Sequence, residues 1–180
     1  MDPLIIIGII VAVLIVIFST TRNKEGKIED DNLTSENFLE ELKEFEMKVI
    51  PERKKGFTEK DVQKELEVFF KKHFETVYRE YALEGQNSKA IDFELGKGKL
   101  GIEVKLAREI IKEGGWDRAL GQVIKMSKRK YKDNLIVLIA GTHDEKESPK
   151  IKEFVTDIKE QNVNYEYVTI KQHEPDDPTS

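Results

Sequence analysis

The feature that most constrains this chain is an uncharged, apolar run near its N-terminus, residues 3–21. A helix of this length rises about 28 Å, close to the roughly 30 Å hydrocarbon core of a bilayer. In lipid, a helix is the one way in which a single segment satisfies its own backbone. We therefore expect one transmembrane helix. A cleaved signal peptide is the alternative, and the acidic Asp2 disfavours it because such peptides start with positive charge.

The charges around this run predict an orientation. Arg22, Lys24 and Lys27 follow the run, and no basic residue precedes it. The positive-inside rule then places the C-terminal part in the cytoplasm. Of 65 charged residues only Asp2 lies within residues 1–20, so 64 of the other 160 residues are charged. The expected protein is a single-pass membrane protein with a very polar cytoplasmic domain.

Composition excludes several classes of protein. No second apolar run approaches the length of a membrane span, which excludes a polytopic transporter. The absence of cysteine excludes a disulfide scaffold, thiol catalysis and Cys-ligated metal sites. The three histidines show no spacing typical of a Ser-His-Asp arrangement. His73 lies on an apolar helical stripe, which favours a core or boundary position over a ligand.

Hydrophobic periodicity predicts an α/β domain at residues 57–172. Residues 22–56 are expected to be a polar linker with one short amphipathic helix, and residues 173–180 a disordered acidic tail. The expected order within the domain is helix, three strands, helix, strand, helix, strand. The helices are predicted from Thr58, over 117–131 and over 148–161, and the strands from Tyr78 and over 89–95, 100–107, 134–141 and 165–170.

The second and third of these strands are expected to form a hairpin around a two-residue turn at Lys97-Gly98. This turn fixes a register in which every pair on one face is apolar, which supports it. The pairs are Phe93 with Ile102, Leu95 with Leu100, and Ile91 with Val104.

The same register places Asp92 opposite Glu103, with Cβ atoms about 5 Å apart. Two carboxylates at this spacing repel each other unless a cation compensates, and a divalent ion bound by both is the natural compensator. Lys105 shares the face of Glu103, because side chains alternate along a strand. The alternative is the exposed polar face of an amphipathic hairpin, since charge is abundant throughout the chain.

At these residues the sequence resembles the PD-(D/E)xK nuclease superfamily. The family motif is an Asp at the end of one strand and E-x-K on the next, which Asp92 and the run Glu103-Val104-Lys105 match without the Pro that often precedes the Asp. Downstream, Gly121-Gln122 is similar to a helix motif in which a Gln approaches the active site. No Tyr follows four residues after Gln122, which disfavours close similarity to RecB-type exonucleases. The Glu-rich first helix and the compact size resemble Holliday-junction resolvases or Mrr-type domains more closely.

The resemblance implies a restriction-endonuclease-like α/β core whose elements follow one another along the chain in the order αβββαβ. Helices flank the mixed sheet of this core. Here that core would lie behind one N-terminal transmembrane helix. The resemblance further implies a divalent-metal-dependent DNA endonuclease. Asp92, Glu103 and the Val104 carbonyl would hold Mg²⁺ or Mn²⁺.

The resemblance also implies the catalytic roles. Lys105 would orient the attacking water, and Gln122 would steady that water or the lysine. The first helix of the family usually supplies a Glu; Glu65 is our candidate and Glu59 the second choice, and a surface role is the alternative for either residue.

Basic residues surround the motif. Residues 89–132 hold 12 Lys and Arg against 6 Asp and Glu, a net charge of +6, and the rest of the chain carries −11. Such a patch attracts polyanions through counterion release. We expect DNA as the partner, with anionic lipid as the alternative. The predicted nucleic-acid-binding residues are Arg118, Lys125, Lys128, Arg129, Lys130 and Lys132.

Two further questions stay open at this point. The same fold could serve as a catalytically inactive, membrane-tethered nucleic-acid-binding or scaffold module in which the carboxylates are unused. The sequence also leaves a homodimer open.

Overall fold

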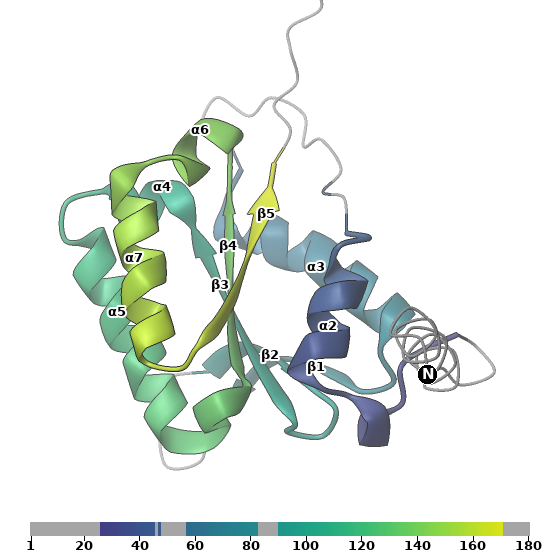
Figure 1. Ribbon diagram of the computed structural model, residues 1–180. Helices are drawn as coiled ribbons and strands as arrows, with labels where there is room; N and C mark the ends of the chain where they lie inside the picture. Colours follow the sequence, from purple (N-terminus) through teal and green to yellow (C-terminus); the bar gives the residue numbers. More distant parts are fainter. Residues whose placement is uncertain (1–25, 46, 48–56, 83–89, 171–180) are drawn as a thin grey trace, which may run out of the picture.

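The computed structural model describes residues 26–45, 47, 57–82 and 90–170. Its centre is a five-stranded mixed sheet in the order β1-β2-β3-β4-β5 (Figure 1). The first three strands form an antiparallel meander, and β4 and β5 run parallel to β3. The strands are β1 (Val77–Ala82), β2 (Ala90–Leu95), β3 (Leu100–Leu106), β4 (Leu135–Gly141) and β5 (Asn164–Thr169).

Helices cover both faces of this sheet (Figure 1). Two of them, α2 and α3, pack on one face, and α4, α5 and α7 pack on the other. The helices are α2 (Ser35–Leu42), α3 (Glu59–His73), α4 (Ala107–Ile111), α5 (Gly115–Met126), α6 (His143–Lys146) and α7 (Pro149–Glu160). Short 3₁₀ turns η1 (Asp30–Asn32) and η3 (Lys132–Asn134) and a π-helical turn η2 (Ser127–Tyr131) complete the described elements.

Local sequence signals explain where these elements lie. The helix α3 begins with a capping box in which the Thr58 side chain and Asp61 satisfy each other's backbone N–H groups. Its Val62, Leu66 and Phe70 are completely buried, as their spacing predicts. The β4 strand is buried at every position because helices cover both of its faces. The predicted strand and helix positions therefore agree with the described elements to within a few residues.

The folded unit extends further toward the N-terminus than the predicted range 57–172. Phe38 of α2 is fully buried and lies against the rings of Phe70 and Phe74 at centroid distances of 5.6 and 5.5 Å. Ile28 pairs with Phe74 in a parallel bridge. Part of the expected linker is therefore core structure, because its few apolar side chains complete the face that α3 covers.

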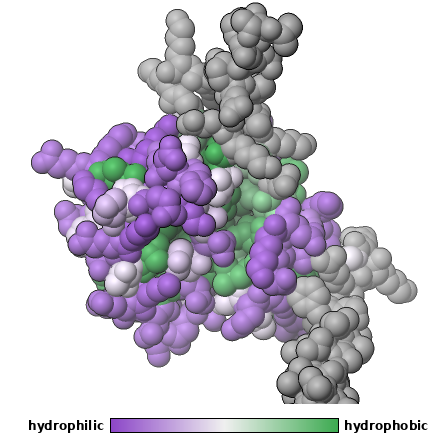
Figure 2. Space-filling model, turned by 45° about the horizontal axis from the view of Figure 1, so that its top comes forward, coloured by the Kyte–Doolittle hydropathy of each residue, from purple (hydrophilic) through white to green (hydrophobic). Residues whose placement is uncertain are grey.

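The expected transmembrane helix is not among the elements that the structure describes. In the stretches that the structure describes, no helix combines the length and apolar character needed to cross a bilayer. The predicted span 3–21 and the predicted tail 173–180 lie outside those stretches. The described structure is an α/β domain with a five-stranded mixed sheet, and it does not support the expected single-pass membrane location with a cytoplasmic domain. The face shown in Figure 2 is largely hydrophilic, and hydrophobic residues show in several patches between the hydrophilic side chains.

The place of α2 in the core predicts a large effect of its central aromatic residue. Phe38→Ala should lower the free energy of unfolding by about 3–5 kcal/mol, because the cavity left among the phenylalanines cannot close completely. The control is Val68→Ala, since Val68 is 67% exposed and its truncation should change stability by about 0.5 kcal/mol or less. Urea denaturation measures both. Equal, small effects would mean that α2 does not belong to the core.

Candidate metal and catalytic site at the β2–β3 hairpin

The hairpin between β2 and β3 turns at the predicted place, but its connection is longer than the predicted two residues, because β2 ends at Leu95 and β3 begins at Leu100. The Lys99 N–H donates to the Gly96 carbonyl at 3.3 Å, which makes Lys97 and Gly98 the two central residues. Gly96, Lys97 and Gly98 all have positive φ, 62°, 54° and 93°, within a four-residue connection that spans residues 96–99. Strand pairing follows the predicted register next to the turn, with Phe93 opposite Ile102 as its last described pair.

Beyond that pair the hairpin differs from the prediction. The described strand pairing does not continue to Asp92, and the Asp92 carboxylate instead accepts a hydrogen bond from the Val104 N–H at 2.7 Å. Ile91 then packs in the core on the α5 side, whereas Phe93 packs in the core on the α3 side. The predicted pairing of Ile91 with Val104 is therefore wrong. The side chains of β2 therefore change faces of the sheet at Asp92. On the neighbouring strand β1, Glu80 lies between the residues that pair with Phe93 and Ile91, has a φ of 52° and has no described partner in the ladder.

Glu103 and Lys105 lie on the face of β3 that was predicted for them. Glu103 is 4% exposed, and its Oε1 accepts from the Lys105 Nζ at 2.5 Å. Its second oxygen, Oε2, is buried and has no hydrogen-bond partner in the described structure. An unpaired buried carboxylate oxygen is costly, and Oε2 is the one oxygen of Asp92 and Glu103 for which the structure describes no donor.

Helix α3 contributes different side chains from the one predicted. Gln63 donates from Nε2 to the Asp92 Oδ1 at 2.8 Å, and Glu59 lies one turn earlier with its Oε1 3.5 Å from the same nitrogen. Two residues along a helix point about 200° apart. Glu65 therefore lies on the side of α3 away from Gln63, and its place in the site is taken by Glu59. The spacing of Glu59 and Gln63, beside the apolar stripe, is the sequence signal that could have identified them.

These groups perturb one another electrostatically. Burial raises the pKa of Glu103 to about 7, since the attraction of Lys105 is outweighed by desolvation together with the repulsion from Asp92. Burial also raises the pKa values of Asp92 and Glu59, again against the attraction of Lys105. Burial opposes the charge of Lys105, but the Glu103 carboxylate raises its pKa above the usual value. Three carboxyl groups thus share one ammonium group, an arrangement that favours an added cation.

The other predicted site residues have no described contact with Asp92, Glu103 or Lys105. Gln122 is half-buried on α5, the helix that covers the face of Glu103, but the structure records no hydrogen bond from it to Asp92, Glu103 or Lys105. Of the basic residues, Arg118 is exposed and donates to the Gly114 carbonyl.

The remaining predicted basic residues do not form one uniform track. Lys128 and Lys132 are exposed and Lys125 is half-buried, and the side chain of Arg129 lies outside the described part. Lys130 instead binds the buried Glu94 at 2.6 Å, and the Tyr131 hydroxyl donates to the same carboxylate oxygen. Sequence reasoning missed this Glu94 cluster, because no local pattern connects residues so far apart in the chain.

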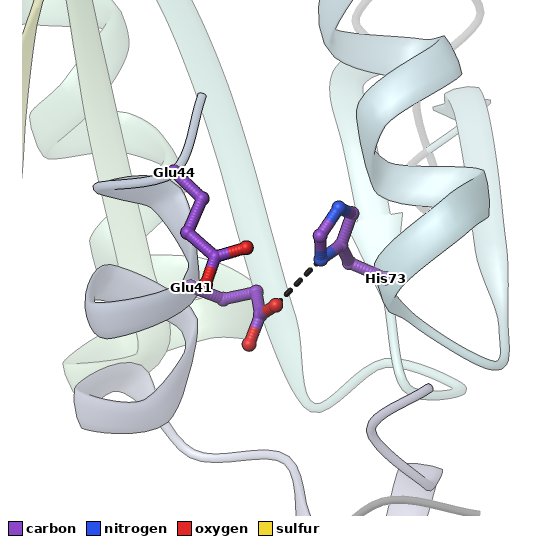
Figure 3. Close-up of side chains that lie close together, drawn as sticks. All are labelled: Glu41, Glu44 and His73. Atoms are coloured by element: carbon purple, nitrogen blue, oxygen red, sulfur yellow. Dashed lines mark hydrogen bonds and ion pairs between the residues drawn. The ribbon is translucent and has the colours of Figure 1, made fainter. Parts of the chain in front are cut away.

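A second group with the chemistry of metal ligands lies elsewhere, between the ends of α2 and α3 (Figure 3). Glu41, Glu44 and His73 each place one ligand atom within 4.8 Å of the others. The His73 Nδ1 is 2.5 Å from the Glu41 Oε1, and its ring stacks on Phe69 at 4.2 Å. His73 is thus buried in a satisfied contact, as its place on the apolar stripe suggested, although Glu41 was not expected as its partner.

A surface groove of about 290 Å³ lies between α2 and β5 and contains none of the predicted site residues. Its lining comes from Leu42, Lys43, Phe45, Met47, Glu166, Tyr167, Val168 and Thr169. The hairpin site is therefore identified by its chemistry rather than by this hollow.

Comparison with protein-family models, with curated proteins and with solved structures finds no match to this chain. None of these comparisons tests the resemblance to PD-(D/E)xK nucleases.

The raised pKa of Glu103 predicts a pH dependence of stability. The unfolded chain releases this proton near pH 4.5 and the folded chain near pH 7, so the folded state binds more protons between these values. In metal-free buffer, stability should therefore fall as the pH rises through this window, by up to about 3 kcal/mol from this group. Glu103→Gln should remove that part of the fall, which urea denaturation at several pH values would measure.

The matched control is Glu65→Gln, the same chemical change on the far side of α3. It should leave the wild-type pH dependence in place. Parallel pH curves for wild type and Glu103→Gln would show that Glu103 ionises as easily in the folded chain as in the unfolded one.

Proposed function

We propose that this protein is a divalent-metal-dependent DNA endonuclease whose active site is the β2–β3 hairpin. The observation that carries the proposal is the buried, unpaired Oε2 of Glu103, which lies in a group with Asp92 and Lys105. A cation is the partner that this chemistry supplies for a buried carboxylate oxygen that no described donor reaches. The D…E-x-K residues give such a cation a function, because in the nucleases that this motif resembles its carboxylates hold the catalytic metal.

The residues present fit a small, hard cation. Asp92 and Glu103 offer carboxylate oxygens, which are the ligands that Mg²⁺ and Mn²⁺ prefer. We assign these two side chains and the Val104 carbonyl as the ligands. A bound divalent ion would polarise the scissile phosphate and lower the pKa of an attacking water. Asp92 keeps one further lone pair on each oxygen, because its two hydrogen bonds use one lone pair each.

Lys105 has a separate role in this proposal. Its ammonium group has no lone pair and so cannot bind a cation. It is oriented by Glu103 and has little exposure to water, which makes it suited to orient the nucleophilic water and to stabilise negative charge that develops on the phosphate. Gln122 on α5 remains our proposal for a side chain that steadies the water or Lys105.

The proposed substrate is DNA, because the segment that holds the motif carries the net positive charge. The exposed Arg118, Lys128 and Lys132 would contact phosphates. Lys130 is instead engaged with Glu94, so its contribution to DNA binding should be smaller than that of its neighbours.

One observation favours the second candidate function, a nucleic-acid-binding or scaffold module without catalysis. Asp92 is already satisfied by Gln63 and Val104, and Lys105 already neutralises one oxygen of Glu103. A site that has lost its chemistry could persist in this form. The unpaired Glu103 Oε2 is the detail that this alternative leaves unexplained.

Substitution of the lysine separates the two functions. Lys105→Ala should retain the fold and DNA binding and lower the cleavage rate with Mg²⁺ or Mn²⁺ by about 10²-fold or more, because an electrostatic group is lost from the chemical step. Lys72→Ala, an exposed lysine on α3, is the control and should cleave at the wild-type rate. The measurement is cleavage of plasmid and branched DNA by the full-length protein.

Two outcomes would contradict the proposal at different levels. If wild-type protein cuts none of the DNA forms with either metal, the scaffold function replaces the nuclease. If Lys105→Ala cuts at the full rate, the nuclease stands and the assigned role of Lys105 is wrong.

A further inference from the structure

We propose that Gln63, held in place by Arg79, is a positioning residue that fixes the orientation of the Asp92 carboxylate for metal binding. This inference rests on the proposed function, because it concerns the same hairpin site. Neither residue belongs to the D…E-x-K motif, and both come from elements that precede it in the chain, α3 and β1.

The contacts of Gln63 define the direction of its amide group. Its Oε1 accepts from the Arg79 Nη2 at 3.4 Å, and its Nε2 donates to the Asp92 Oδ1 at 2.8 Å. A flipped amide would place its oxygen against the Asp92 carboxylate and its NH₂ group against the guanidinium, and both contacts would be repulsive. The charges on the two sides therefore select one orientation of a side chain that is only 5% exposed.

Arg79 is itself anchored. Its Nη1 donates to the Glu67 Oε2 at 2.9 Å, and Glu67 lies one helical turn after Gln63 on α3. Arg79 also pairs with Phe93, the residue that follows Asp92 on the neighbouring strand. The guanidinium thus bridges α3 and the sheet at the level of the site, and its buried Nε has no hydrogen-bond partner in the described structure.

The result is a carboxylate held from both sides. Gln63 donates to one oxygen of Asp92, and the Val104 backbone donates to the other. Each oxygen keeps a second lone pair, so a metal can bind without displacing either donor. Partners of this kind, which bind a ligand rather than the metal, orient the ligand before the metal arrives.

Glu103 has no comparable support. Its described hydrogen bond comes from Lys105, a flexible side chain, and its other oxygen is unpaired. The orientation of the metal site should therefore depend on Asp92, and through Asp92 on Gln63. Removal of the Gln63 donor should weaken metal binding although Gln63 itself does not touch the ion.

The test substitutes Gln63 by methionine, which has a similar length and no N–H group. In the full-length protein, Gln63→Met should lower the affinity for Mn²⁺ by about 10- to 100-fold in calorimetry, the range typical of losing a partner of a metal ligand. The rate of DNA cleavage at low Mn²⁺ should fall in parallel and recover in part at saturating Mn²⁺, while the KM for DNA stays within about twofold. A purely structural role would not give this recovery.

Two further variants complete the design. Glu65→Met is the matched control, because Glu65 lies on the opposite side of α3, and it should bind Mn²⁺ as wild type does. Arg79→Lys keeps a cation for Glu67 but loses the fork that reaches Gln63, so it should weaken Mn²⁺ binding by about threefold or more. This second variant decides the question if Gln63→Met does not fold.

The outcomes are distinguishable. If wild type binds Mn²⁺ and cleaves DNA while Gln63→Met or, failing that, Arg79→Lys binds Mn²⁺ as tightly as wild type, the positioning role is wrong and the proposed function stands. If wild type neither binds Mn²⁺ nor cleaves DNA, the proposed function is wrong, and the positioning role is overturned with it. The expected pattern is weaker Mn²⁺ binding in the Gln63 and Arg79 variants and wild-type Mn²⁺ binding in the Glu65→Met control.

Discussion

The hydrogen bond from the Val104 N–H to the Asp92 carboxylate is the interaction on which the site depends. At this point a side chain takes the place that a backbone carbonyl would hold in a regular antiparallel ladder. The exchange lets β2 turn over, so that Ile91 and Phe93 enter different halves of the core. It also brings an acidic group to the edge of β3, where Glu103 and Lys105 are fixed by the strand. Without it, Asp92 would project from one face of a flat hairpin.

Much of this hairpin could be predicted from sequence, because two independent constraints agree. The Lys97-Gly98 turn sets the register, and the apolar pairs on one face would be broken by a slip of one residue. What could not be predicted is the break in the ladder at Asp92, because periodicity describes regular strands only. The strand turnover depends on a side chain that competes with the backbone, and alternation of apolar residues carries no sign of that competition.

The errors on the helices have similar physical causes. The apolar stripe of α3 shows which face of the helix is buried but not which edge of that face lies over the hairpin. The sequence alone therefore could not decide whether Glu65 or Glu59 lies near the site. The segment before residue 57 is mostly polar, and its few apolar side chains find partners only once α3 presents Phe70 and Phe74. Contacts of this kind, like the Glu41–His73 pair, join residues that are far apart in the chain.

The central claim is that a divalent ion binds at Asp92 and Glu103, and anomalous X-ray scattering from crystals grown with Mn²⁺ tests it most directly. The account predicts one strong anomalous peak about 2.1–2.3 Å from oxygens of Asp92, Glu103 and the Val104 carbonyl, with the Glu103 Oε2 no longer unpaired. A peak at Glu41, Glu44 and His73 alone, or no peak at the hairpin with Mn²⁺ in large excess, would contradict it.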